Sequence, residues 1–354
     1  MKTKIRIMAL SVLFMISLSI LTPVLAMTQG VTDTAIPVEK YEEYADKVIK
    51  DFMALNGIVY TSELKLSNPI PVENDNDGNN KAVFLFRNSE CIGMMMITFI
   101  NGRFTSSFSK ESIPAITSAL NESRHFSLVA SNEALWIVTD GIGTNISGRS
   151  DVILAYSENR QNYSNENQTI ALKGITESAN GTVGNTRAYS FLNVPIVPNA
   201  AAPDGSSDGI CWAAAMASMI RYKAGASSVT ATSLYNELKN AYSGTPSGLC
   251  TWVSRCFSLY SLSYTHKHSG ANFNTVKGII DSGKPIYCWL SCTGGAHSVV
   301  ISGYESGYGN YYYRLVDSNK PSVVTVHFTD ADATSFTYAT TYGYTYTGWV
   351  CRMY

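Results

Sequence analysis

The sequence has little charge of either sign. Only 15% of its 354 residues are charged, and the formal net charge at pH 7 is -1. Lysine and arginine are nowhere concentrated into a basic patch, which is the feature that attracts a phosphate backbone. The composition therefore speaks against nucleic acid as a partner.

Cysteine is also scarce. Seven cysteines are too few for a disulfide framework in a chain of this length. One lies far upstream and the others lie in the C-terminal part; they are Cys91, Cys211, Cys250, Cys256, Cys288, Cys292 and Cys351. Cys288 and Cys292 stand in an apolar run, which predicts core positions. A Cys250–Cys256 bridge is one open pairing, but the connectivity does not follow from sequence.

Long apolar runs are absent beyond the N-terminus, so no later segment reaches the roughly 20 residues of a membrane span. Residues 7–21 are apolar, follow a basic start, and precede a Val-x-Ala pattern that ends at Ala26. This pattern is typical of a secretory signal peptide, here residues 1–26. A membrane anchor is the alternative, but the apolar stretch is short for one. We expect a secreted protein, extracellular or at the cell surface, without stable membrane insertion.

Two parts follow the signal peptide. The first covers residues 27–187 and predicts one helix over 39–55 followed by an antiparallel sheet. Its strands are predicted at 81–87, 91–100, 103–109, 135–139 and 152–156. Asn101-Gly102 is a two-residue hairpin signal, and residues 112–120 predict a short helix with Pro114 in its first turn. Residues 157–187 are rich in Asn, Ser, Gly and Thr, which indicates a linker.

Cys211 opens the second part with the setting of a reactive thiol. A polar breaker run over 204–209 precedes it, and residues 212–223 are rich in Ala and Met, which predicts a buried helix. Cys211 then lies in the first helical turn, where free backbone N–H groups and the helix dipole favour a thiolate. The same N–H groups can donate to an oxyanion.

His297 and Asp317 lie at the ends of two predicted strands. His297 follows a Gly294-Gly295 turn and precedes an apolar run, whereas Asp317 ends the run 311–316. The residues between read as a hairpin over 305–310, and such a hairpin brings Asp317 back near His297. Cys211, His297 and Asp317 can therefore act as nucleophile, base and orienting group, with Asn319 as a second candidate for the third role.

These residues carry a family resemblance. Cys211-Trp212-Ala213, Gly295-Ala296-His297 and Leu315-Val316-Asp317 resemble the three motifs of papain-like cysteine proteases, in the same order. The likeness is to compact bacterial secreted members, namely the staphopain-like, streptopain-like and peptidase C39-like families, and it covers about residues 188–354. It implies an α+β fold with a helical half and an antiparallel sheet half, a protein or peptide substrate, and no metal or organic cofactor. It also implies that residues 27–187 form a pro-domain that inhibits the enzyme until the linker is cut.

One position departs from the family. The family places a Gln about six residues before the nucleophile to complete the oxyanion hole, and Gly205 stands there in this chain. Asn199 carries the same amide donor on a shorter stem, so it is our candidate for the oxyanion hole. Losing one such donor typically costs about 10²–10³ in rate.

The rest of the second part predicts helices and then strands. Helices are predicted at 231–242, 252–260 and 273–281, and strands at 286–291, 298–304, 311–316 and 322–328. The Tyr- and Thr-rich tail over 335–353 has strand propensity, and we expect its tyrosines on the surface or in contact with substrate. His266 and His268 have no cysteine or carboxylate at ligand spacing, which favours a solvated loop over a metal site.

Two rival functions stay open at this level. A Cys-His-Asp site also supports transamidation or hydrolysis of cell-wall amides. A surface-binding protein on a degenerate protease scaffold is the other rival, and the missing Gln and the Tyr-rich tail motivate it. The first part likewise has an alternative interpretation as an adhesive or stabilising domain.

Overall fold

The computed structural model describes residues 36–74, 79–131, 134–139, 142–147, 168–175, 187–205, 209–292, 295–341 and 345–354. The predicted signal peptide over 1–26 and the predicted strand over 152–156 lie outside them. The chain divides into two units, residues 1–37 and residues 38–354, and every element below belongs to the second unit. Within the described residues, no helix combines the length and the apolar character that a membrane span requires.

The first part contains two helices and a set of strands. They are α1 (Val38–Leu55), β1 (Leu64–Ser67), β2 (Ile70–Asn74), β3 (Lys81–Arg87), β4 (Glu90–Ile100), β5 (Arg103–Ser109), α2 (Pro114–Asn121), β6 (Ser127–Ser131), β7 (Ala134–Thr139), β8 (Ile142–Asn145) and β9 (Leu172–Gly174). Asn101 and Gly102 both have positive φ, 51° and 75°, as a two-residue hairpin between β4 and β5 requires. Strand β9 pairs with β1, so the predicted linker over 157–187 contains a strand of the sheet.

The second part contains four helices among its described residues. Its elements are β10 (Ala188–Phe191), α3 (Cys211–Ala224), α4 (Ala231–Ala241), α5 (Cys250–Leu259), β11 (His266–Lys267), α6 (Phe273–Asp281), β12 (Ile286–Cys292), β13 (Gly295–Gly307), β14 (Asn310–Asp317), β15 (Val324–Phe328), β16 (Tyr338–Ala339), β17 (Thr345–Tyr346) and β18 (Gly348–Met353). The predicted hairpin is confirmed, but its loop is shorter than 305–310. Strands β13 and β14 pair as far as Gly307 and Asn310, and Tyr308 and Gly309 form the turn with φ of 54° and 75°.

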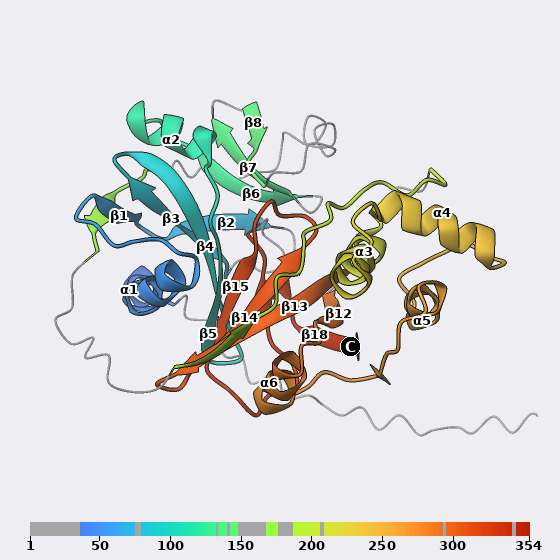
Figure 1. The fold of residues 1–354 in the computed structure, drawn as a ribbon. Coiled ribbons are helices and arrows are strands. Elements are labelled where there is room, and N and C mark those ends of the chain that lie inside the picture. Colours follow the sequence, from blue (N-terminus) through green and yellow to red (C-terminus); the bar gives the residue numbers. More distant parts are fainter. Residues whose placement is uncertain are drawn as a thin grey trace, which may run out of the picture. The chain divides into compact units, whose positions relative to one another are not determined.

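One sheet runs through both parts. Its strands follow the order β11-β18-β12-β13-β14-β15-β5-β4-β3-β2-β6-β7-β8, and β15 pairs antiparallel with β5. Figure 1 shows α3, α4 and α5 beside the sheet at the second part. The α+β class predicted from sequence is confirmed. Because β5 and β15 are hydrogen-bonded, the sheet is continuous across the boundary that we predicted near residue 187.

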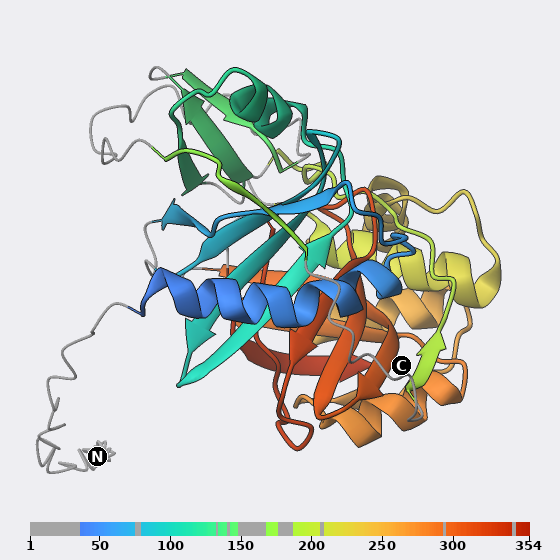
Figure 2. The same cartoon turned by 90° about the vertical axis from the view of Figure 1, so that its left-hand side faces the viewer.

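Helix α1 lies over the junction of the two parts. Figure 2 shows it crossing the strands on one face of the sheet. The Phe52 ring lies 5.6 Å from that of Phe108 in β5 and 5.8 Å from that of Tyr312 in β14. Helix α1 therefore buries one apolar face against strands of both parts, which stabilises their association.

Candidate active site

Cys211 is the first residue of α3. The residue before it, Ile210, has an apolar side chain and makes no capping hydrogen bond, and Gly225 ends the helix with φ of 67°. Most of α3 is buried, including its run of alanines, and Figure 1 shows the helix lying against β13. Small side chains allow this close approach to the sheet. The Cys211 side chain is half-buried, so a thiol stands at an uncapped helix start where the dipole favours negative charge.

His297 and Asp317 meet on one face of the sheet. Val299 pairs with Asp317 across β13 and β14, so His297 is the diagonal neighbour of Asp317. The His297 Nε2 atom lies 2.8 Å from Asp317 Oδ1, and the two side chains are 1% and 0% exposed. The hairpin predicted from sequence therefore brings these two residues into contact.

The electrostatics of this pair follow from burial and charge. Burial by itself lowers the pKa of His297, but the Asp317 carboxylate and a hydrogen bond with Cys211 hold that pKa well above its ordinary value. Burial acts to raise the pKa of Asp317, but hydrogen bonds and the charge of His297 lower it to about 2. Both shifts favour an imidazolium beside a carboxylate, which is the state that orients and charges a catalytic histidine.

Two tyrosines of the C-terminal tail complete this arrangement. The Tyr338 hydroxyl donates to Asp317 Oδ2 at 2.7 Å, and the Tyr346 ring stacks on His297 with centroids 5.5 Å apart. Tyr338 is 0% exposed and Tyr346 is 2% exposed. For these two residues, the expected surface position was wrong, while substrate contact stays a prediction. Among the described residues, β16 and β17 form a separate two-stranded sheet, so the Tyr/Thr alternation did not predict which tyrosines pack against the large sheet.

The turn after Asp317 holds Asn199 near the start of α3. The Asn199 side chain donates through Nδ2 to Asn319 Oδ1 at 3.0 Å, and its backbone N–H donates to the Ser318 carbonyl. A Cβ on Gly209 would lie 2.9 Å from Asn199 Nδ2, so the amide packs against the backbone two residues before Cys211. Asn319 faces Asn199 through its side chain, and the group in contact with His297 is Asp317.

Comparison with known protein families gave one match. Residues 191–346 match the model of the Peptidase_C39 like family. The match supports a cysteine-protease-like family for this segment. A comparison with curated proteins found no match. The C39-like segment includes Cys211, His297 and Asp317, and it begins at the end of β10. The resemblance to a cysteine-protease family is thus confirmed, while likeness to staphopain or streptopain types stays a prediction.

Gly205 occupies the place where the resembled family carries Gln. Its φ is 80°, a backbone conformation that favours glycine over any residue with a side chain. A glutamine side chain at this position would therefore be strained. Asn199 reaches the start of α3 from the preceding extended segment, which is anchored where Val197 N–H donates to Ser218 Oγ on α3.

Several predictions around the C39-like segment need correction. Cys288 is buried as predicted, but Cys292 is only half-buried. Cys250 contacts Cys351 instead of Cys256. His266 lies in β11 with its ligand atom close to the sulfurs of Cys250 and Cys351, so a cysteine is near it in space. Sequence spacing missed this group because antiparallel pairing of β11 with β18 brings the distant residues together.

Proposed function

We propose that this protein is a cysteine peptidase that hydrolyses peptide bonds in protein or peptide substrates. The observation that supports it most strongly is the buried contact between His297 and Asp317, with the Cys211 thiol acting on the same imidazole ring. Because Asp317 takes the Nε2 side of the ring, Nδ1 is the atom through which His297 exchanges a proton with Cys211. The family match of residues 191–346 independently supports peptidase chemistry.

In the proposed reaction, the Cys211 thiolate attacks the carbonyl carbon of the scissile peptide bond. The charge that forms on the carbonyl oxygen is stabilised by the backbone N–H of Cys211, and we assign the side-chain amide of Asn199 as a second donor. The imidazolium of His297 gives its proton to the leaving amine. Water then attacks the thioester with His297 as base, which releases the acid and restores the thiol. Asp317 keeps the ring oriented throughout.

We further propose that the enzyme is exported and made as a pro-enzyme, with residues 27–187 as intramolecular inhibitor. The support is that the first part contacts the segment that follows Asp317. Lys320 donates to Glu111 Oε1 at 2.8 Å, and the Ser107 hydroxyl donates to the carbonyl of Ala339, next to Tyr338. Cleavage in the predicted linker leaves these contacts in place, so release of inhibition also requires the first part to dissociate or shift.

The decisive experiment combines a covalent thiol probe with two substrate assays. The full chain is incubated with an epoxide-type inhibitor, and intact mass and peptide mapping locate the adduct. Casein or peptide hydrolysis is then compared with an amine-acceptor assay and a cell-wall amide assay. We expect the adduct on Cys211 and hydrolysis of peptides. Faster amine incorporation or cell-wall amide hydrolysis would replace the peptidase by one of those activities. A folded, linker-cleaved protein without an adduct would indicate a binding protein.

The ion pair with Asp317 sets the alkaline limit of activity. Because Asp317 raises the pKa of His297, Asp317→Asn is expected to lower that pKa and move the alkaline limb of the kcat/KM profile to lower pH. The limb moves to lower pH because the reaction needs the imidazolium beside the thiolate, and a lower pKa of His297 means that the imidazolium loses its proton at lower pH. Asp281→Asn removes an exposed carboxylate paired with Lys277 and should leave the profile unchanged. An alkaline limb that stays in place in Asp317→Asn contradicts the assigned role.

The proposed role of the Asn199 amide as an oxyanion donor can be tested by comparing variants of Asn199 and of its hydrogen-bond partner Asn319. Asn199→Ala removes the proposed oxyanion donor and is expected to lower kcat/KM by about 10²–10³-fold. Asn319→Ala removes the same Asn199–Asn319 hydrogen bond but keeps the donor, so it should cost less than about 10-fold. Equal losses in the two variants would make Asn199 a positioning residue only.

A further inference from the structure

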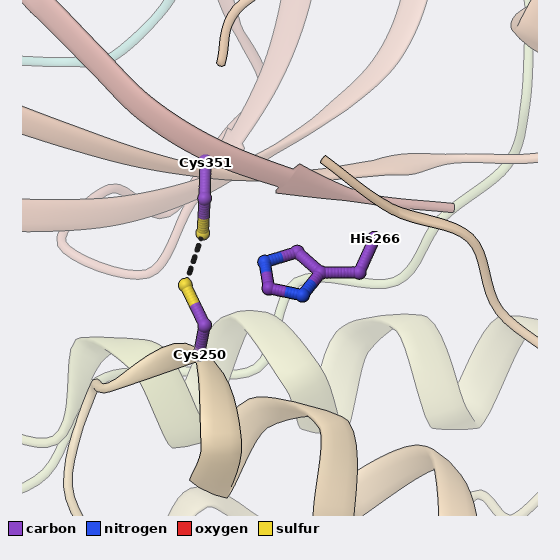
Figure 3. A group of neighbouring side chains, drawn as sticks. All are labelled: Cys250, His266 and Cys351. Carbon is purple, nitrogen blue, oxygen red and sulfur yellow. Dashed lines mark hydrogen bonds between the residues drawn. The ribbon is translucent and has the colours of Figure 1, made fainter. Parts of the chain in front are cut away.

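A second group of reactive side chains lies apart from the His297–Asp317 pair. Cys250 begins α5, Cys351 lies in β18, and their sulfur atoms are 2.7 Å apart. His266 comes from β11, and the three ligand atoms lie within 4.8 Å of one another. Figure 3 shows the ring of His266 directed toward the two sulfurs. Such a group suits either a soft metal ion or a disulfide, and the geometry distinguishes them.

The sulfurs are too close for a shared metal. Two thiolates on one tetrahedral zinc ion, each at about 2.3 Å, lie roughly 3.8 Å apart. The observed separation of 2.7 Å is well inside that spacing. A metal would thus require the two side chains to move apart, whereas a covalent bond requires only a further small approach. Cys250 comes from the start of a helix and Cys351 from a strand, so a bond between them would cross-link two different elements.

His266 is the base that lies beside the two thiols. Its Nε2 atom is buried and has no hydrogen-bond partner among the residues that the structure describes. Burial and the neighbouring His268 lower the pKa of His266, which favours the neutral form of the ring. Thiol–disulfide exchange proceeds through the thiolate, so a neutral imidazole beside two thiols promotes it.

We propose that Cys250 and Cys351 form a disulfide bond, made by exchange with a small-molecule disulfide such as oxidised glutathione. The half-buried Cys250 thiolate attacks the external disulfide and releases one reduced thiol. The buried Cys351 thiolate then attacks the Cys250 sulfur in the mixed disulfide and releases the second. Two protein thiols are oxidised, one external disulfide is reduced to two thiols, and His266 relays the protons. Such a bond persists outside the reducing cytosol.

This bond links the helical side of the C39-like segment to its sheet. It joins residues 101 positions apart in the chain, from the start of α5 to the last strand. Gly248, two residues before Cys250, packs close to Trp212, because a Cβ on Gly248 would lie 3.4 Å from the Trp212 ring. The cross-link therefore holds in place the segment that packs against Trp212, the residue after Cys211. It does not depend on whether Cys211 is a nucleophile.

Peptide mapping tests the bond in the full chain carrying Cys211→Ala, which prevents self-digestion and thiol shuffling. The protein is incubated with oxidised glutathione, denatured, alkylated without reductant and digested. We expect one linked species that contains Cys250 and Cys351, lighter than the two free peptides by two hydrogen atoms. Cys91, Cys256 and Cys288 should be alkylated and serve as internal controls. A linked pair that involves Cys256 or Cys288 instead, or complete alkylation of Cys250 and Cys351, overturns the proposal.

Thermal unfolding and zinc binding complete the test. Reductant is expected to lower the Tm of the oxidised chain by about 5 °C or more, because the bond closes a long loop. Cys250→Ser, Cys351→Ser and the double variant should each lack this response to reductant. Zinc is then added to the reduced protein. A metal site would replace the disulfide if the protein kept one zinc ion per chain through dialysis and after treatment with oxidised glutathione. In that case Cys351→Ser and His266→Ala should both lose the zinc ion.

Discussion

Replacing Cys211 by alanine is expected to lower kcat for peptide hydrolysis by about 10⁴- to 10⁶-fold. The variant lacks the only atom that forms the proposed thioester, so the residual rate reflects substrate binding and oxyanion stabilisation alone. The helix start should survive, because Cys211 is half-buried and alanine is the strongest helix former. Steady-state kinetics on a peptide substrate, together with circular dichroism, measure the two effects separately.

Cys292→Ser is the matched control for this prediction. Cys292 is another half-buried cysteine of the C39-like segment, and its thiol donates to the nearby carbonyl of Gly295. Its replacement should change kcat by less than about 3-fold, within the range of ordinary surface substitutions. If Cys211→Ala retained more than about one tenth of the wild-type rate, Cys211 would not be the nucleophile.

Glu111→Ala is expected to destabilise the protein by about 3–5 kcal/mol, because it leaves a buried ammonium without its carboxylate. The Lys320 side chain is 0% exposed and that of Glu111 is 8% exposed, so solvent screens this pair weakly. Lys320 Nζ also donates to the carbonyl of Ser147, at the longer distance of 3.4 Å. Urea unfolding of the full chain in the Cys211→Ala background measures the free energy of unfolding.

An exposed ion pair between the same two parts is the control. Arg103 in β5 pairs with Asp330, and the side chains are 62% and 38% exposed, so Arg103→Ala should cost less than about 1 kcal/mol. The double variant Glu111→Leu, Lys320→Met removes both buried charges and should recover most of the loss. A loss below about 1 kcal/mol in Glu111→Ala would mean that Lys320 finds water in the folded protein.

These contacts bear on how the proposed pro-enzyme is activated. The pair Glu111–Lys320 and the β5–β15 pairing both cross the boundary between the two parts. Strand β10 begins at Ala188 and pairs with β13, while Arg187 forms ion pairs with Asp51 in α1 and Glu305 in β13. Cutting the linker alone therefore leaves a hydrogen-bonded sheet and buried charges intact. We expect both fragments to elute together after cleavage until a further step separates them.

Local sequence signals predicted much of the secondary structure. Helix α6 has the predicted bounds 273–281, and α3 extends the predicted helix by one residue at each end. The Asn101-Gly102 hairpin also forms as predicted. These elements are set by apolar periodicity, by helix formers and by residues that tolerate positive φ, which all act within a few positions of the chain. The motifs around Cys211, His297 and Asp317 are likewise short, and each could be recognised from a few neighbouring residues.

The sequence by itself determined the order of the elements, the α+β class, and the three residues whose neighbours match a cysteine peptidase. Only the tertiary structure decided what surrounds them. It buried Tyr338 and Tyr346 against Asp317 and His297, joined β5 to β15, and brought Cys250 to Cys351. The physical reason is that these contacts close long stretches of chain. Their formation depends on how whole sheets and helices pack, and no short window of residues encodes that packing.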